Sequence, residues 1–164
     1  MAKAKEVKTN AMRILEAMNI PFKYYTYECA EFVDGIQIAD KLGLPYEKVY
    51  KTLVTRGSSR NYFVFVIPIA EELDMKKAAR AVGEKSVEML HVKDINAVTG
   101  YVRGGCTAIG MKKQFVTRID EGARLQPDIY VSGGRIGSQI NLKPDELAAA
   151  AKAEFADLIK NKEL

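Results

Sequence analysis

The sequence predicts one compact α+β domain with a curved, mixed and mostly antiparallel sheet flanked by helices. The chain has 164 residues, enough for a single domain with a substantial core. Stretches with strand periodicity and stretches with helical periodicity are mixed, without the regular alternation of βαβ units. No internal repeat, low-complexity tract or linker divides the chain. We therefore expect residues 1–164 to form one domain.

The helices are predicted from capping residues and from apolar residues that recur on one helical face. Thr9, Asp34 and Asp74 each precede such a stripe, and Gly43 and Gly83 follow the second and third stripes. The expected helices are 10–18, 34–42 and 75–82, with one further turn at 45–48 and a short helix at 92–98. Pro144 opens a terminal amphipathic helix that is expected to continue to about Ile159. Its inward-facing residues are Leu147, Ala151, Phe155 and Leu158.

The strands are predicted from β-branched and aromatic runs that turn residues separate. The run Tyr62–Pro68 is wholly apolar, and the cluster Gly57–Asn61 separates it from the run Val49–Val54. These two runs indicate an antiparallel hairpin through the core. Further short strands are expected at 22–27, 87–90, 115–119, 129–132 and 138–142.

Composition narrows the class of protein. The 25 Lys and Arg residues exceed the 21 Asp and Glu residues by four, a modest excess that fits a protein that tolerates a nearby polyanion. No apolar stretch approaches the roughly 20 residues of a membrane span, and the basic segment Met1–Lys8 has no apolar core after it, as a secretory signal would. We expect a cytoplasmic protein without a membrane partner.

The cysteine and histidine content argues against a disulfide framework or a metal site. Cys29 and Cys106 are the two cysteines and His91 is the single histidine, without metal-ligand spacing. We expect no metal and no cofactor. An activated thiol would need a base, which leaves a Cys106–His91 pair as a minor alternative.

Lys51 is the most informative candidate residue. It lies in the apolar run Val49–Val54, where a lysine is expensive to bury. Two glycine-rich segments follow, at residues 100–113 and 132–137. Neither has the spacing of a phosphate-binding loop or a dinucleotide fingerprint. Paired glycines can present backbone N–H groups to a ligand, although tight turns and bulges use them too. A solvent-facing lysine is the alternative interpretation of Lys51.

Together, these segments suggest catalysis in which the protein mainly positions the substrate. A fixed cation and backbone donors can suffice to cleave an already activated acyl group such as an ester. The strand Val49–Leu53, the segment from Gly100 to Lys113 and the run Tyr130–Arg135 resemble, in this order and spacing, the YbaK/EbsC family of aminoacyl-tRNA deacylases. The likeness covers nearly the whole chain, from the strand around Tyr27 to the terminal segment carrying Phe155, and it is greatest to the Cys-tRNA(Pro) deacylases of the family.

The resemblance implies a trans-editing enzyme related to the editing domain of prolyl-tRNA synthetase, which cannot fully reject cysteine because the two amino acids are close in size. It implies the 3′ end of tRNA(Pro) as a partner, and prolyl-tRNA synthetase as a possible one. In the family mechanism, the thiol of the cysteinyl substrate attacks its own ester carbonyl. Attack by water on the same ester is left open beside attack by the thiol. The alternative functions are editing of another aminoacyl-tRNA, such as Ala-tRNA(Pro), and a non-catalytic module that binds tRNA or a synthetase.

The resemblance also assigns site residues. Lys51 corresponds to the family lysine that positions the substrate. The expected substrate-binding residues are Tyr27, Phe32, Thr52, Gly104, Gly105, Cys106, Ser132, Gly133 and Gln139. Two of them depart from the family pattern. Gln139 stands where some members have an aspartate, and Cys106-Thr107-Ala108 replaces an Ile-Ser-Pro form, which can alter the floor of the pocket.

Overall fold

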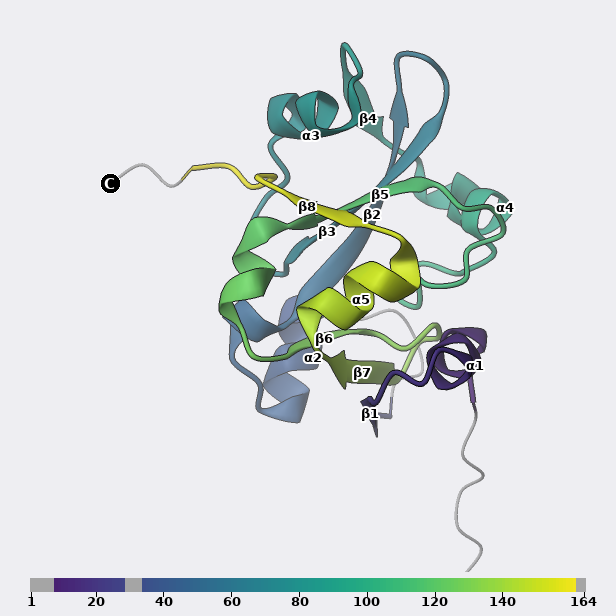
Figure 1. Ribbon diagram of the computed structural model, residues 1–164, viewed down its shortest axis with the longest axis vertical. Helices are drawn as coiled ribbons and strands as arrows, with labels where there is room; N and C mark the ends of the chain where they lie inside the picture. The colour runs from purple at the N-terminus through teal and green to yellow at the C-terminus, as the bar shows by residue number, and fades with distance from the viewer. Residues whose placement is uncertain (1–7, 29–33, 162–164) are drawn as a thin grey trace, which may run out of the picture.

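Two β-sheets and five α-helices form the part of the protein that the structure, a computed structural model, describes: residues 8–28 and 34–161 (Figure 1). The smaller sheet has the antiparallel order β1-β7-β6, with β1 Lys23–Thr26, β7 Ser138–Leu142 and β6 Ile129–Ser132. The larger sheet is mixed, with the order β4-β2-β3-β5-β8. Its strands are β4 Val87–Met89, β2 Tyr50–Gly57, β3 Tyr62–Pro68, β5 Val116–Asp120 and β8 Glu154–Ala156.

The two sheets adjoin along β2 and β6. A parallel bridge pairs Val49, just before β2, with Tyr130 in β6. Lys51 and Ser132 each follow this bridge by two residues, so the two strands carry them toward the same region. This junction places the predicted site lysine beside the second glycine-rich segment.

The hairpin β2–β3 confirms the prediction from the apolar runs, and its register pairs Lys51 with Ile67. Alternate residues of β3 enter two different cores. Val64 and Val66 pack in the core between the sheets, whereas Phe65 and Ile67 pack against α3 on the other face. Burial on both faces explains why the strand is apolar throughout rather than alternating.

Except for the end of α5, the helices begin and end close to the predicted residues. They are α1 Asn10–Ala17, α2 Gly35–Leu42, α3 Met75–Val82, α4 Ile95–Thr99 and α5 Pro144–Ala151, with 3₁₀ turns at Tyr46–Lys48, Val92–Asp94 and Glu121–Leu125. The side chains of Thr9, Asp34 and Asp74 cap α1, α2 and α3. Gly43 and Gly83 end α2 and α3 with left-handed backbone. In Figure 1, α5 lies between the strands of the two sheets.

The predicted terminal helix is wrong beyond residue 151. Lys152 adopts a left-handed conformation that ends α5, and β8 then pairs in parallel with β5, with Phe155 opposite Ile119. The apolar residues recur at helical spacing to Leu158, so the local pattern favours a helix. The edge of β5 offers unpaired backbone groups, and pairing with them overrides that preference.

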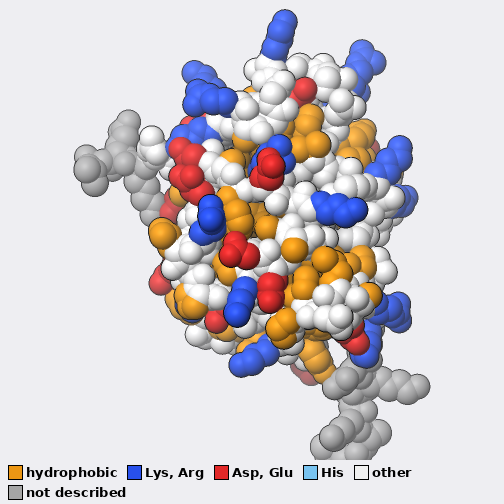
Figure 2. All heavy atoms as spheres, viewed as in Figure 1, with side chains coloured by type: hydrophobic (Ala, Val, Ile, Leu, Met, Phe, Trp, Pro, Cys, Tyr) orange, Lys and Arg blue, Asp and Glu red, His pale blue; other side chains and the backbone are white. Residues whose placement is uncertain are grey.

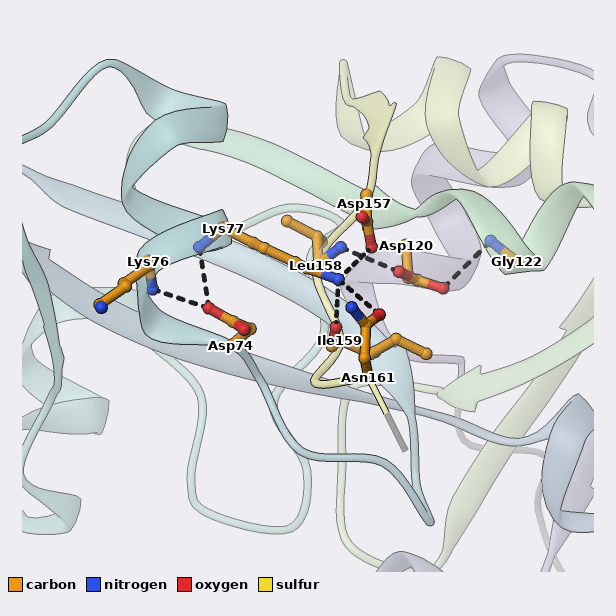
Figure 3. A network of polar contacts seen from close by, with 9 residues as sticks. All are labelled: Asp74, Lys76, Lys77, Asp120, Gly122, Asp157, Leu158, Ile159 and Asn161. Atoms are coloured by element: carbon orange, nitrogen blue, oxygen red, sulfur yellow. Dashed lines mark hydrogen bonds and ion pairs between the residues drawn. The ribbon is translucent and has the colours of Figure 1, made fainter. Parts of the chain in front are cut away.

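Polar contacts fasten the segment after β8 to the start of α3 (Figure 3). Nζ of Lys77 donates to Oδ1 of Asp157 at 3.0 Å, to the carbonyl oxygen of Ile159 at 2.8 Å and to Oδ1 of Asn161 at 3.1 Å. The buried carboxylate of Asp120 accepts from the backbone N–H groups of Leu158 and Gly122. Residues 157–161 are thereby held to α3 and to the larger sheet.

Surface charge on the face in Figure 2 is scattered, with basic side chains among acidic ones and apolar ones between them. No helix among the described residues has the length and apolarity that a membrane crossing needs.

Candidate functional site

A cavity of about 350 Å³ opens along β2. One wall is β2 itself, from Tyr50 to Val54. The first turn of α2 and residue Ile69 line the end near Lys51, and the segment from β4 to α4 lines the other end. The remaining wall comes from Gln139 of β7 and from the two glycine-rich segments, which we call the first glycine loop (residues 100–113) and the second glycine loop (residues 132–137).

Lys51 is half-buried and lines this cavity. Its Nζ donates a hydrogen bond to the carbonyl oxygen of Ile69 at 3.2 Å, and the described residues offer it no other hydrogen-bond acceptor. An ammonium group has three N–H donors. The side chain is therefore anchored by one bond and keeps donors for a ligand.

Burial lowers the pKa of Lys51, because water is replaced by protein around the charged form. The carboxylates of Glu72, Asp34 and Glu71 oppose this shift. The ammonium group of Lys51 is thus partly shielded from water and has acidic groups nearby. These acids compensate its charge without an ion pair to Lys51 among the described residues.

The two glycine loops pack directly against each other at Gly105. A side chain there would place its Cβ 2.8 Å from the Cα of Arg135 and 2.9 Å from the backbone nitrogen of Ile136. Only a residue without Cβ allows this backbone approach. A Cβ at Gly133 would meet the side chain of Ser138, which can turn, so this glycine is less strictly required.

The first glycine loop is held in shape from within. The hydroxyl of Tyr101 donates to the carbonyl oxygen of Ile109 at 2.6 Å, across the loop. The N–H of Gly105 bonds the carbonyl of Val102, and the N–H of Lys112 bonds the carbonyl of Thr99. These hydrogen bonds fix the shape of the loop, which forms part of the cavity wall.

Cys106 lines the cavity as a protonated thiol. Burial raises its pKa to about 11, and a hydrogen bond with the Thr99 side chain offsets only part of the shift. A thiol with a raised pKa is a weak nucleophile near neutral pH. His91 is exposed, precedes the 3₁₀ turn Val92–Asp94 and does not line the cavity. This arrangement gives no support to a Cys106–His91 pair.

Alkylation kinetics should reveal the raised pKa of Cys106. A shift from 9.0 to about 11 lowers the thiolate fraction at pH 8 about 100-fold. Iodoacetamide should accordingly modify Cys106 in the folded protein about 100-fold more slowly than in the urea-unfolded chain, as measured by peptide-resolved mass spectrometry that separates Cys106 from Cys29. Because the unfolded thiol ionises first, this group should also reduce stability as the pH rises from 9 to 11. Equal alkylation rates in the two states would show that the thiol is not protected.

The structure brings most of the predicted site residues together. Lys51, Thr52, Gly104, Cys106, Ser132 and Gln139 line the cavity. Gly105, which packs against the second glycine loop, and Gly133, which packs against Ser138, do not line the cavity. Tyr27 does not line the cavity, and its N–H bonds the carbonyl of Gly137 in the second glycine loop at 3.0 Å. Phe32 lies outside the described residues.

Sequence reasoning missed two parts of the cavity. Asp34 is predictable as a helix cap, but the fold also brings it and Gly35 to the lysine end of the cavity. The far end is apolar and includes Met89, Leu90, Val92 and Ile95. Met89 and Val92 are 46% and 53% exposed, so this end presents apolar side chains to solvent. No group of three potential metal ligands occurs among the described residues.

Comparison with known proteins identifies the family that has this fold and cavity. Residues 33–150 match the model of the aminoacyl-tRNA editing domain, so the chain belongs to that family. A protein of Enterococcus faecalis provisionally named Cys-tRNA(Pro)/Cys-tRNA(Cys) deacylase EbsC is 46% identical over 160 residues, which cover 96% of this chain and 98% of that protein. The resemblance inferred from the motifs is therefore confirmed.

Solved structures share the fold. A scaffold protein from work on epitope backbone grafting has a TM-score of 0.81 and 25% identity, covering 93% of this chain and 96% of its own. A protein provisionally described as a trans-editing enzyme for prolyl tRNA synthetase has a TM-score of 0.80 and 23% identity, covering 93% of this chain and 99% of its own. These matches confirm the predicted α+β class.

Proposed function

We propose that this protein is a cytoplasmic trans-editing deacylase that removes cysteine from mischarged Cys-tRNA(Pro), and that residues 1–164 act as one editing domain. The observation that carries the proposal is the lysine ammonium of Lys51, held by one protein acceptor at the wall of a cavity of about 350 Å³. Family membership gives the reaction class, and the 46% identical relative is named for cysteinyl-tRNA. An aminoacyl ester is already activated, so orientation and a nearby cation can supply much of the catalysis.

The substrate supplies the nucleophile in this proposal. The cysteinyl thiol attacks its own ester carbonyl, so that a sulfur–carbon bond forms as the ester carbon–oxygen bond breaks. The thiol proton passes to the departing ribose oxygen, and water then opens the thiolactone to give free cysteine. Lys51 holds the ester where the thiol can reach the carbonyl carbon, and it stabilises the negative charge that forms on the carbonyl oxygen. Because Cys106 is protonated, it supports the proposal that the protein supplies no thiolate nucleophile of its own.

The shape of the cavity supports a pose for the tRNA end. The apolar end lies next to Val54, whose carbonyl accepts from Leu90 N–H, and Thr55 pairs with Met89. Lys51 and Val54 are three residues apart in one strand, or about 10 Å. This matches the reach from an aminoacyl ester across the ribose to the adenine. We place the ester at Lys51 and the terminal adenine against Met89 and Val92.

The surface supports a need for a partner. A net charge of +4, with basic groups scattered over the face in Figure 2, favours weak binding of the tRNA body by this chain alone. We propose that prolyl-tRNA synthetase supplies the tRNA, with no metal or other cofactor in the reaction. Tight, salt-insensitive binding of uncharged tRNA by the isolated protein would contradict this part of the proposal.

A panel of charged tRNAs tests the proposed specificity. Purified protein should deacylate Cys-tRNA(Pro) much faster than Ala-tRNA(Pro), Ser-tRNA(Pro) or Pro-tRNA(Pro), because only cysteine has the attacking thiol. Faster loss of alanine than of cysteine would redirect the function to another editing substrate and imply attack by water. Stable binding of charged tRNA without ester loss would indicate a binding module.

A further inference from the structure

We propose that the side-chain amide of Gln139 is the acceptor for the α-amino group of the aminoacyl substrate, an inference that rests on the proposed function. Gln139 is 4% exposed, and it lines the same cavity as Lys51. Its Oε1 is buried without a hydrogen-bond partner, and among the described residues its amide makes no hydrogen bond. A buried amide oxygen without a partner is costly, so a polar ligand that supplies the missing donor would be favoured.

The fold places Gln139 in a row with the site lysine. Ser132 of β6 pairs with Gln139 of β7, and the parallel bridge between Val49 and Tyr130 joins β2 and β6 two residues before Lys51 and Ser132. Lys51, Ser132 and Gln139 therefore lie on three neighbouring strands, all three lining the cavity. Because Lys51 and Gln139 both line this one cavity, we place the aminoacyl group between their side-chain ends.

The chemistry of the substrate decides which of its groups faces Gln139. The ester carbonyl is an acceptor and suits the ammonium of Lys51, whereas Oε1 needs a donor. The thiol is a weak donor and must remain free to attack. The α-amino group is a strong donor, so the open acceptor of Gln139 suits it. Ser132 is less available, because its Oγ already accepts from the N–H of Gly134 at 3.2 Å.

Binding of two non-hydrolysable analogues tests the proposal independently of turnover. One is 3′-cysteinylamino-3′-deoxyadenosine, and the other is its 3-mercaptopropionyl counterpart, which lacks the α-amino group but keeps the thiol. By calorimetry, the wild-type protein should bind the first analogue about 10- to 100-fold more tightly, the range for one buried hydrogen bond to a charged donor. Gln139→Leu should lose this preference while binding the second analogue as the wild type does.

Two further measurements separate recognition from a structural role. Because Gln139 makes no side-chain hydrogen bond to lose among the described residues, Gln139→Leu should unfold at the wild-type temperature or above it. Gln139→Glu keeps an acceptor at the same position and should keep the preference for the amino group. Equal affinity of the wild type for the two analogues, no measurable binding of either analogue, a lower melting temperature with equal losses on both, or a Gln139→Glu variant that behaves as Gln139→Leu would each overturn the proposal.

The test also distinguishes this inference from the proposed function. Failure of the wild type to deacylate any charged tRNA would remove the enzymatic function, whereas the analogue preference reports recognition of the amino group by itself. Conversely, rapid deacylation of Cys-tRNA(Pro) with no analogue preference would keep the enzyme and remove the role of Gln139.

Discussion

Lys51→Ala should lower the rate of Cys-tRNA(Pro) deacylation at least 100-fold, the effect typical of removing one positioned electrostatic donor. The fold should not suffer, because the variant loses a single 3.2 Å hydrogen bond to Ile69 and also removes a charge that burial disfavours. We expect a melting temperature within a few degrees of the wild-type value. Single-turnover deacylation and thermal unfolding on the same preparation measure both effects.

Lys48→Ala is the matched control for the lysine. Lys48 lies three residues earlier, outside the cavity lining, and its Nζ is 3.6 Å from Oδ1 of Asp128. A partly exposed ion pair of this kind contributes little to stability. The control should therefore deacylate at the wild-type rate. Full activity in Lys51→Ala, or equal losses in the two variants, would remove the assigned role of Lys51.

Gly105→Ala is expected to have the second-largest effect, on both stability and activity. The new Cβ would lie 2.8 to 2.9 Å from backbone atoms of Arg135 and Ile136, which cannot turn away as a side chain can. Forcing the two glycine loops apart should cost about 1–3 kcal/mol of unfolding free energy, as overpacking does. The displaced wall of the cavity should also lower kcat/KM at least 10-fold, because small misplacements of positioning groups are costly to catalysis. Urea unfolding and deacylation kinetics report the two quantities.

Gly43→Ala separates loss of stability from loss of the site. Gly43 ends α2 with φ of +67°, and a Cβ at this residue would meet no neighbouring atom within 4 Å, so the substitution adds backbone strain without a clash. Strain of this kind costs about 1 kcal/mol. Because Gly43 lies outside the cavity lining, this variant should lose stability and keep its activity. Wild-type activity in Gly105→Ala would mean that loop packing does not shape the site.

Local signals made most of the fold predictable. Capping by Thr9, Asp34 and Asp74 fixes three helix starts, and a turn between two apolar runs fixes the central hairpin. The wrong prediction for residues 152–159 relied on the same kind of local signal. Helical spacing is a local property, whereas the pairing of β8 with β5 depends on an edge strand more than thirty residues earlier in the sequence.

The parts of the site that could be predicted are those whose residues are unusual for their place in the sequence. A lysine inside an apolar strand and two glycine loops stand out, and the structure brings them to one cavity. Asp34, Met89 and Val92 do not stand out, because a capping aspartate and scattered apolar residues are ordinary in any chain. Their place in the cavity follows from the neighbours of β2, which sequence periodicity does not specify. The unpartnered amide oxygen of Gln139 likewise becomes visible only when its surroundings are known.

The most direct test of the account is the half-life of the cysteinyl ester on tRNA(Pro), measured with and without the purified wild-type protein at neutral pH. We predict that the protein shortens this half-life by at least 100-fold and that free cysteine and intact tRNA are the final products. An unchanged half-life at saturating protein, with or without prolyl-tRNA synthetase present, would contradict the account.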